Sequence, residues 1–416
     1  MVNKRWHLLL ALALLAIVAY LPTLRQPLLE DDYPNIAEAH ALGLHILSDP
    51  IFGIRSSFFL LIDGLYRLFG MTAAAYYIPL IVLHVFNTWL VYALGYWRPV
   101  GYRVSAWAAA FFAVYEGHQE GIMWVSGATE PLLFLFGVGA FLCWLRFLYE
   151  GKWAWYAAAL VAFVPALYSK ESAFICVALM LLPAAFDRST WRRAVWIIPF
   201  GLLAGASVAH VLYTRTYSFR FNDGSFSLHA PFWLTWPNTL VRLFWIWGLL
   251  ALAAVAIWKP ARWMVVTGIG LLWAGLSLVP YSFLTYATRI PSRQVYLASA
   301  GLALVVGLAL MELYSRYWRR WPVLVAVVCA VILLQNVVYL WTKKRGQFLE
   351  RAAPTEQLIA LSRRTQGPIF VECFPRPPLV ADWAVRLTTG HELIWDAAKR
   401  GSAAATFCYA VRGKSQ

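Results

Sequence analysis

Three consecutive carboxylates, Glu30, Asp31 and Asp32, follow the first apolar run of the chain in the stretch LLEDDYPNIAEAH. Polar residues commonly mark where a membrane helix leaves the bilayer, and an Asp shortly before Pro34 favours the start of a helix. A carboxylate can also take the proton of an attacking hydroxyl group, and a second acid beside it shifts its basicity. The stretch is therefore either a helix boundary or a pair of catalytic acids.

Three further polar clusters lie beside apolar runs: EGHQEGIMWVSGATE at 116–130, YSKESA at 168–173 and RIPSRQVYLASAG at 289–301. Ionisable groups next to membrane spans are costly and usually face a cavity or a partner. Several clusters of this kind on one side of a membrane would suggest a shared polar chamber.

Each cluster also has a simpler interpretation. Lys170 and Glu171 fit the hydrophilic turn of a helical hairpin. His118 fits a local hydrogen bond, and Arg293 fits a span end whose guanidinium reaches the lipid headgroups. Only their relative placement distinguishes these interpretations from a site.

The elements that must position these residues are membrane helices. Because 61% of the residues are hydrophobic and only 13% are charged, the composition is that of a polytopic membrane protein. Windows of about 20 apolar residues predict about eleven spans, near 7–24, 76–97, 104–115, 131–149, 153–168, 172–186, 194–213, 237–258, 263–284, 294–314 and 322–341.

Basic residues set the expected orientation. The first span follows Lys4 and Arg5 and has no convincing cleavage site, which indicates a signal anchor with a cytoplasmic N-terminus. Alternate loops then hold the basic residues Arg98, Arg103, Lys152, Arg188, Arg192, Arg193, Lys259, Arg262, Arg316, Arg319 and Arg320. The net charge of +15 is thus a topology signal, and nucleic acid is excluded as a partner because no basic face gathers on a water-exposed domain.

With this orientation the four polar clusters all lie outside the cytoplasm. We expect an integral, multi-pass protein of a bacterial inner membrane, with its active site facing the periplasm or exterior. The segments IAEAHALGLHIL and SSFFLLIDGLYRLFG carry apolar residues at helical spacing and predict short helices at the membrane surface.

After the last span, the sequence changes from long apolar runs to a more polar tail. Its alternating helix-like and strand-like segments predict a small extracytoplasmic α/β domain over 343–416, after a membrane domain over 1–342. The fold class is therefore an all-α polytopic membrane protein with a small C-terminal α/β domain. Cys373 and Cys408 fall in this tail, where an oxidising compartment permits a disulfide.

The ordered set of motifs resembles the GT-C superfamily of polytopic glycosyltransferases, and most closely the protein O-mannosyltransferases and the transmembrane repeat-bearing O-mannosyltransferases. DDYPNI is similar to their acidic first-loop motif and AYYIPLIVLHVFNTWLVYAL to their histidine-containing second span. FAVYEGHQEGIMWVSGATE, YSKESA and SRQVYLASAG resemble their later motifs, in consistent order over about residues 7–315.

The resemblance also has departures. Tyr115 and Glu116 replace the usual His-Pro, Ala128 stands where Arg is common, Ser56 replaces a Pro and Ser292 replaces an acid. The C-terminal repeats of such relatives are absent. The resemblance therefore leaves the sugar open, and the acceptor is a glycan, a lipid or a protein.

The resemblance implies transfer of a sugar from a polyprenyl-phosphate donor to an acceptor hydroxyl, with inversion. Such transfer needs a base, cations for the leaving phosphate and shelter from water. Asp31 and Asp32 are the catalytic candidates. Asp31 is assigned as the base, since Asp32 is better placed to cap the helix that contains Pro34, or alternatively to orient the acceptor. The residues assigned to substrate binding are His118, Glu120, Lys170, Glu171, Arg289 and Arg293, with Arg293 the main phosphate contact because its guanidinium matches two oxygens.

No cofactor is expected. A divalent metal held by Asp31, Asp32, His118 and Glu120 is conceivable, but no HExxH or CxxC spacing supports it. Membrane lipids must surround the protein and deliver the donor.

Two rival functions stay open. A lipid-linked sugar flippase or transporter also needs a polar cavity, but its ionisable residues would lie near mid-bilayer in two related halves. A noncatalytic scaffold gains nothing from four polar clusters on one side. Release of free lipid phosphate separates the transferase from both alternatives.

Overall fold

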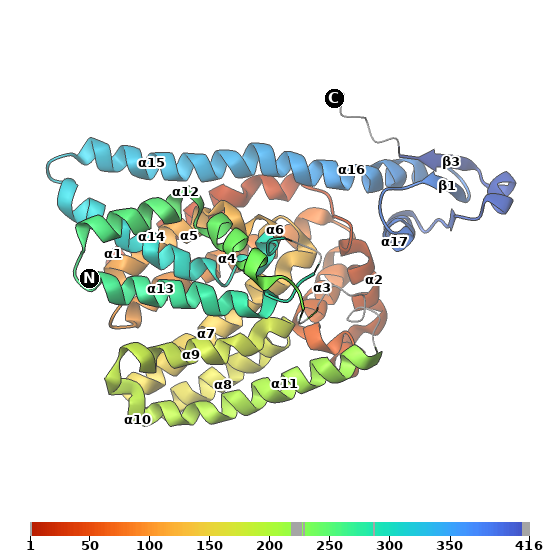
Figure 1. Cartoon of the computed structure of the whole chain (residues 1–416). Helices are drawn as coiled ribbons and strands as arrows, with labels where there is room; N and C mark the ends of the chain where they lie inside the picture. Colours follow the sequence, from red (N-terminus) through yellow and green to blue (C-terminus); the bar gives the residue numbers. More distant parts are fainter. Residues whose placement is uncertain (1, 218–226, 228, 286–287, 410–416) are drawn as a thin grey trace.

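The computed structural model describes residues 2–217, 227, 229–285 and 288–409. Each of the eleven predicted spans corresponds to a helix of a single bundle (Figure 1). These helices are α1 (Val2–Tyr20), α4 (Ala73–Ala93), α5 (Gly101–Val114), α7 (Thr129–Glu150), α8 (Trp153–Leu167), α9 (Ile175–Phe186), α11 (Ile198–Tyr217), α12 (Phe232–Trp258), α13 (Trp263–Leu278), α14 (Ser299–Tyr317) and α15 (Pro322–Tyr339).

Length separates these helices into two groups. Among the described residues, eight helical segments are long and apolar enough to cross a membrane. The other three, α5, α8 and α9, have only 14, 15 and 12 residues. Because a full crossing takes about 20 helical residues, these three contribute to the bundle without the length of a complete span.

The two short helices predicted after the first span are present as α2 (Asp32–Leu42) and α3 (Ser56–Phe69). They meet at an angle of 96°. Together with α6 (Gln119–Ile122) and α17 (Pro378–Thr389), they lie at the end of the bundle opposite α10 (Trp191–Ala194) and the turn between α14 and α15 (Figure 1). The polar clusters and the basic loops are therefore at opposite ends, as the loop charges predict.

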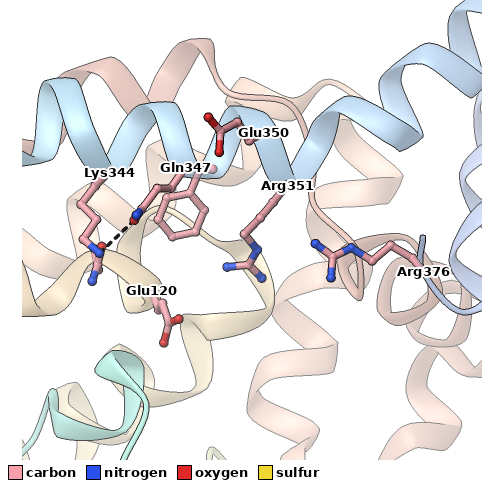
Figure 2. A pocket seen from close by; sticks show the side chains of 8 residues that line it. Glu120, Lys344, Gln347, Glu350, Arg351 and Arg376 are labelled. Carbon is pink, nitrogen blue, oxygen red and sulfur yellow. Dashed lines mark hydrogen bonds between the residues drawn. The ribbon is translucent and has the colours of Figure 1, made fainter. Parts of the chain in front are cut away.

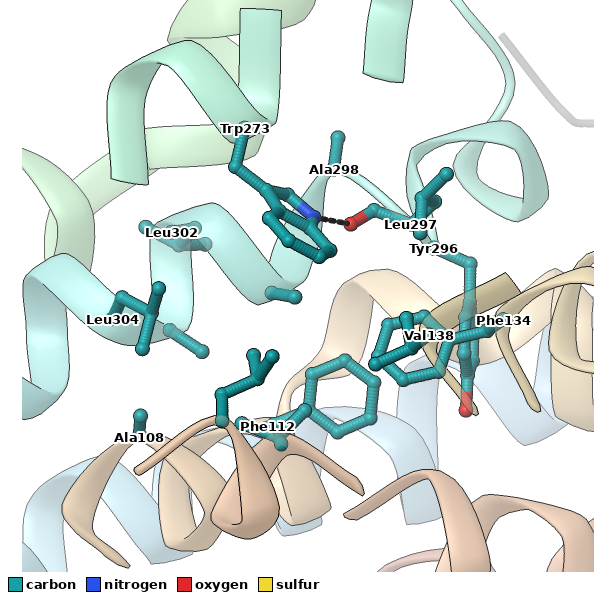
Figure 3. Close-up of a cluster of buried hydrophobic side chains, with 14 of the residues drawn as sticks. Ala108, Phe112, Phe134, Val138, Trp273, Tyr296, Leu297, Ala298, Leu302 and Leu304 are labelled. Atoms are coloured by element: carbon teal, nitrogen blue, oxygen red, sulfur yellow. Dashed lines mark hydrogen bonds between the residues drawn. The ribbon is translucent and has the colours of Figure 1, made fainter. Parts of the chain in front are cut away.

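Helix α14 forms the centre of the bundle. All of its residues from 299 to 310 are buried, and small residues allow its neighbours to approach closely. A Cβ atom on Gly301 would lie 2.2 Å from the carbonyl oxygen of Gly270 in α13, and one on Gly307 would lie 2.6 Å from the amide nitrogen of Ala108 in α5. Large side chains fill the space just before α14, where the Trp273 indole donates a hydrogen bond to the Leu297 carbonyl at 3.0 Å (Figure 3).

The C-terminal part grows out of the last membrane helix. Helix α15 continues through a π-helical turn (Leu340–Lys344) into α16 (Arg345–Ser362). The predicted domain boundary between residues 342 and 343 thus lies inside a continuous helix, which makes the tail an extension of the bundle.

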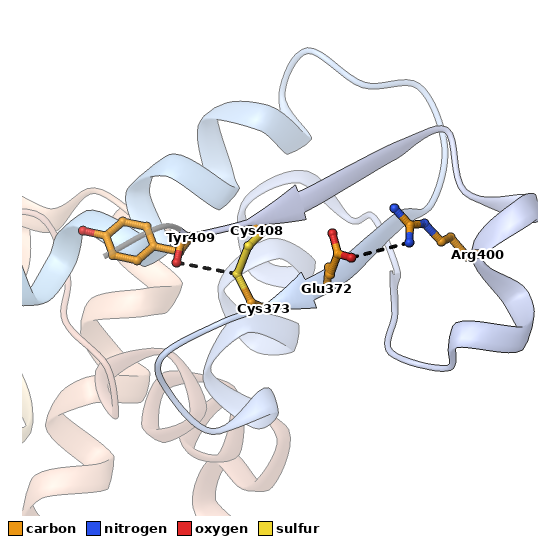
Figure 4. The surroundings of a disulfide bond; sticks show 5 residues. All are labelled: Glu372, Cys373, Arg400, Cys408 and Tyr409. Atoms are coloured by element: carbon orange, nitrogen blue, oxygen red, sulfur yellow. Dashed lines mark hydrogen bonds and ion pairs between the residues drawn. A yellow bond between two sulfur atoms is a disulfide. The ribbon is translucent and has the colours of Figure 1, made fainter. Parts of the chain in front are cut away.

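The tail has the predicted α/β character. Its three parallel strands are β1 (Ile369–Cys373), β2 (Leu393–Ile394) and β3 (Ala405–Cys408), in the order β2-β1-β3, with α17 after β1. Cys373 and Cys408 lie opposite each other in the sheet and form a disulfide (Figure 4). The sequence permitted this pairing without requiring it, and the structure contains it.

Candidate active site

The four polar clusters meet at one end of the bundle through direct contacts. The backbone nitrogen of Ser126 donates to Oδ1 of Asp32 at 2.8 Å, and its hydroxyl donates to the same oxygen at 2.5 Å. The backbone nitrogen of Arg293 donates to Oε2 of Glu120 at 3.2 Å. Tertiary structure thus joins segments that are 94 and 173 residues apart in the sequence.

Within the acidic run, Asp31 and Asp32 have different environments. Asp32 is 1% exposed and accepts a third hydrogen bond from the backbone nitrogen of Leu29 at 2.8 Å, whereas Asp31 is exposed. The expectation that Asp32 caps α2 is wrong, because the helix begins at Asp32 itself and the cap position is Asp31. The Asp32 carboxylate instead fastens its loop to Ser126, which leaves Asp31 as the member of the pair that faces outward.

Glu30 connects the acidic run to the C-terminal part. Its backbone has a φ of 39°, a left-handed conformation that is unfavourable for a residue with a side chain. Its carboxylate accepts hydrogen bonds from Nε of Arg351 at 3.2 Å and from Nη2 at 2.7 Å, and it pairs with Nη2 of Arg376 at 2.7 Å. Two arginines of the tail therefore hold the residue next to Asp31.

A cavity of about 830 Å³, named here the Arg289 cavity, opens beside these contacts. Its charged lining consists of four cations, Arg242, Arg289, Lys343 and Lys344, and two carboxylates, Glu116 and Glu120. Arg242 pairs with Glu116 at 2.7 Å. An excess of positive charge therefore remains, which suits an anionic ligand.

A second cavity of about 460 Å³, named here the Arg351 cavity, adjoins the first (Figure 2). It shares Gln119, Glu120 and Lys344 with the Arg289 cavity, and is completed by Gln347, Phe348, Glu350, Arg351 and Arg376. Glu120 is thus the predicted site carboxylate that lines both cavities.

Lys170 and Glu171 line neither cavity. The Glu171 carboxylate accepts a hydrogen bond from Nε of Arg55 at 2.6 Å, and the Lys170 ammonium lies 3.6 Å from Oε1 of Glu130. Tyr281 donates a further hydrogen bond to Glu130 at 3.0 Å. Burial and the nearby Arg55 charge lower the pKa of Lys170, so these side chains form a buried network that satisfies its own charges.

His118 also lines neither cavity, although its neighbours Gly117 and Gln119 line the Arg289 cavity. The side chain is fully buried between the rings of Phe112 and Tyr296, with centroids 4.3 and 4.4 Å away, and its Nε2 lies 2.7 Å from the hydroxyl oxygen of Ser299. Burial is the main cause that lowers its pKa well below the ordinary value. A neutral imidazole in this position packs the core and offers no charge to a phosphate.

Arg293 belongs neither to the residues that line the cavities nor to the buried residues described above. It is partly exposed, and its guanidinium carbon is 4.7 Å from the centroid of the Trp124 ring. The guanidinium of Arg351 lies at the same distance from that ring. Arg293 therefore stands close to the wall of the Arg351 cavity without lining either cavity.

The sequence did not predict several basic residues of the cavity linings, namely Lys343, Lys344, Arg351 and Arg376. Lys344, Gln347 and Arg351 are spaced by three and four positions, so a helix that continues past the last span places them on one face. That spacing could have been recognised in the sequence. The predicted domain boundary at Lys343 separated these residues from the last span, so the continuous helix was not expected. Among the residues that the structure describes, no three His, Cys, Asp or Glu side chains form a group that could hold a metal ion.

Comparison with known proteins gives neighbours in structure alone. No protein-family model matches the chain, and no curated protein matches it. Among solved structures, it is similar to the archaeal oligosaccharyltransferase AglB from Archaeoglobus fulgidus, in complex with an inhibitory peptide and a dolichol-phosphate, at 12% identity and a TM-score of 0.59. The match covers 96% of this chain and 65% of AglB, so the chain spans about two thirds of that enzyme.

A second neighbour is ArnT from Cupriavidus metallidurans bound to undecaprenyl phosphate, at 15% identity and a TM-score of 0.52, covering 98% of this chain and 90% of ArnT. The chain has the GT-C fold. The predicted fold class is thereby confirmed, whereas identities this low leave the chemistry of this chain to its own residues.

Proposed function

We propose that this protein is a GT-C glycosyltransferase that moves a sugar from a polyprenyl-phosphate donor to an acceptor hydroxyl. The observation that carries the proposal is the Arg289 cavity, where four cations face two carboxylates at the end of a membrane bundle. Cations in a partly enclosed site stabilise the charge that develops on a leaving phosphate. Both structural neighbours were solved with a polyprenyl phosphate, which is the ligand chemistry that such a cavity suits.

We assign the donor phosphate to Arg289 and Lys344, which line the cavity, with Arg293 as the further phosphate contact proposed from the sequence. Arg289 is exposed and belongs to the segment that leads into α14. Lys344 lies at the junction of the two cavities. Lys170 and Glu171, by contrast, hold the 168–173 segment in place through Arg55 and Glu130.

Asp31 is the proposed base. The acceptor oxygen attacks the anomeric carbon, its proton passes to the Asp31 carboxylate, and the bond from that carbon to the phosphate oxygen breaks with its electrons on the phosphate. Asp31 suits this role because it is the exposed acid of the run and follows Glu30, which is bound to two residues of the Arg351 cavity. One displacement of this kind inverts the anomeric configuration.

A turnover assay tests the proposal. The purified protein in lipid nanodiscs is incubated with radiolabelled undecaprenyl-phosphate sugars, hexoses and pentoses in turn, and with membrane extracts as a source of acceptor. We expect time-dependent release of undecaprenyl phosphate with at least one donor, and transfer of label to a product. Movement of intact donor between leaflets without release of lipid phosphate would indicate a flippase and refute the proposal.

The proposed orientation places the site end of the bundle in the periplasm or at the cell exterior. Basic loops at the opposite end support it, because such loops stay in the cytoplasm. Reporter fusions in the 188–193 loop should show a cytoplasmic location, and fusions after Gln416 should show an external one. Exchange of the two results would place the site on the cytoplasmic side.

A further inference from the structure

The Arg351 cavity differs from its neighbour in charge balance. Its lining contains three cations, Lys344, Arg351 and Arg376, and two carboxylates, Glu120 and Glu350, so its formal charge is lower than that of the Arg289 cavity. Glu30 offsets the remaining charge, because its carboxylate is bound by both Arg351 and Arg376. The cavity is thus polar but nearly neutral, and a phosphate gains much less there than in the Arg289 cavity.

The same lining supplies many hydrogen-bonding groups. Gln119 and Gln347 each offer an amide donor and acceptor, and Glu120 offers a carboxylate (Figure 2). Lys344 donates to Oε1 of Gln347 at 3.0 Å, which orders this pair at the cavity wall. Alternating donors and acceptors of this kind match neighbouring hydroxyl groups, each of which both donates and accepts.

An aromatic ring lies beside the same wall. Phe348 belongs to the lining, and the Trp124 ring lies directly behind Arg351. The volume of about 460 Å³ lies within the range of small-ligand pockets. Size, polarity and neutrality together fit a sugar ring and do not favour a lipid tail or an anion.

We propose that the Arg351 cavity is the acceptor subsite and that it binds a neutral, polyhydroxylated group, the terminal sugar of a glycan. This inference rests on the proposed function, in which the adjoining Arg289 cavity holds the donor phosphate. Glu120, which lines both cavities, then lies between donor and acceptor. Because α16 and the loop after β1 supply Gln347, Arg351 and Arg376, the C-terminal part of the chain selects the acceptor.

Filling the cavity tests the subsite. The probes are methyl glycosides of mannose, glucose and galactose, and binding is measured by saturation-transfer NMR on the protein in nanodiscs. Gln347→Trp places an indole in the cavity, and Gln357→Trp makes the same change at an exposed position of α16 outside both cavities. We expect binding of at least one glycoside by the wild type and by Gln357→Trp, and a loss of about tenfold or more in Gln347→Trp, since several hydrogen bonds are displaced.

A smaller change keeps the test valid if the indole disturbs folding. Gln347→Ala removes only the amide, and should weaken glycoside binding by about three- to tenfold, the usual effect of one or two lost hydrogen bonds. Arg289→Ala should leave glycoside binding unchanged while it weakens binding of undecaprenyl phosphate.

Four results would overturn the subsite: no glycoside binds the wild type, Gln347→Trp binds as well as Gln357→Trp, glycoside binding depends on Arg289, or only peptides accept the sugar. Failure of every form to bind undecaprenyl phosphate has another meaning. That result counts against the proposed function and leaves a glycoside site in the Arg351 cavity intact.

Discussion

The 168–173 segment and the 289–293 segment carry similar charged residues next to apolar runs, yet their charges meet different partners. Lys170 and Glu171 are held by Glu130 and Arg55 in a buried network. Arg289 lines a cavity in which cations exceed carboxylates. A charged residue beside a membrane span therefore either pairs with another side chain and stabilises the fold, or remains available to bind a ligand. Only the partner of the charge in the tertiary structure distinguishes these two roles.

The acidic run repeats the contrast between adjacent residues. Asp32 accepts three hydrogen bonds and is buried, whereas Asp31 is exposed. If the contrast is functional, substitution of the residues proposed to meet a ligand, Asp31, Arg289 and Arg293, should reduce turnover and leave folding intact. Substitution of the residues whose charges are satisfied within the protein, such as Asp32 and Glu171, should lower stability and leave the turnover of the folded protein intact.

The largest expected effect is that of Asp31→Asn. The amide keeps the size of the side chain but removes its basicity, so turnover should fall by about a hundred- to ten-thousandfold, the usual contribution of a general base. Donor binding and the unfolding temperature should be unchanged. Release of undecaprenyl phosphate measures the first, and differential scanning fluorimetry measures the second.

Asp32→Asn is the matched comparison. Its amide nitrogen would face the backbone nitrogen of Leu29 or the Ser126 donors, so a buried pairing is lost at a cost of about 1–3 kcal/mol in the free energy of unfolding. Turnover of the folded fraction should persist. If Asp32→Asn is inactive at normal stability while Asp31→Asn is active, the two assignments are reversed.

The next largest effect on turnover is expected from Arg289 and Arg293, the arginines proposed to contact the donor phosphate. Arg289→Ala and Arg293→Ala should each reduce turnover by about ten- to a hundredfold, because a charge-assisted contact typically contributes about 1.5–3 kcal/mol. Arg293→Lys should lose less, since it keeps the charge and loses only the two-pronged geometry. Steady-state release of undecaprenyl phosphate is the measurement.

The control for both arginines is Arg319→Ala, an exposed arginine between α14 and α15 at the far end of the bundle. It should retain full turnover. Normal turnover in Arg293→Ala would indicate that this guanidinium only packs on Trp124, and normal turnover in Arg289→Ala would remove the donor assignment.

Glu171→Gln tests whether the ion pair with Arg55 stabilises the fold. It breaks the ion pair with Arg55 and should lower the free energy of unfolding by about 1–3 kcal/mol, less than a fully buried pair because both side chains keep some exposure. Glu312→Gln breaks a pair within α14 whose arginine, Arg316, is 44% exposed, compared with 27% for Arg55, and should cost about 0–1 kcal/mol. Chemical denaturation in detergent compares the two; a loss of turnover in Glu171→Gln at unchanged stability would place this segment in the reaction.

Loss of the disulfide should affect the stability of the tail more than turnover. Cys373→Ser with Cys408→Ser removes a link between β1 and β3 that normally contributes about 2–4 kcal/mol, and limited proteolysis should cut the tail faster. Turnover should fall only slightly, since Arg351 still holds Glu30 from α16. Cys143→Ser in α7 is the control, and a severe loss of turnover in the double variant would mean that Arg376 alone maintains the acidic run.

Much of the architecture could be predicted from the sequence. Apolar run length gave all eleven bundle helices, and alternating patterns gave α16, α17 and the three strands of the tail. Of the predicted site residues, Glu120 and Arg289 line the cavities, whereas the other six do not, namely Asp31, Asp32, His118, Lys170, Glu171 and Arg293. A charged residue beside a span has the same sequence signature whether its partner is a ligand or another side chain.

The sequence by itself determined that the bilayer is the main solvent, which segments form helices, and at which end of the bundle the polar clusters gather. These features follow from the length of each apolar run and from the charges of the loops, which are local properties of the chain. Tertiary structure decided which charges remain for a ligand, since that depends on contacts between distant segments. Arg351 meets Glu30 over 321 positions and Arg55 meets Glu171 over 116. No local pattern specifies such pairings, and they alone separate the two cavities from the buried network beside them.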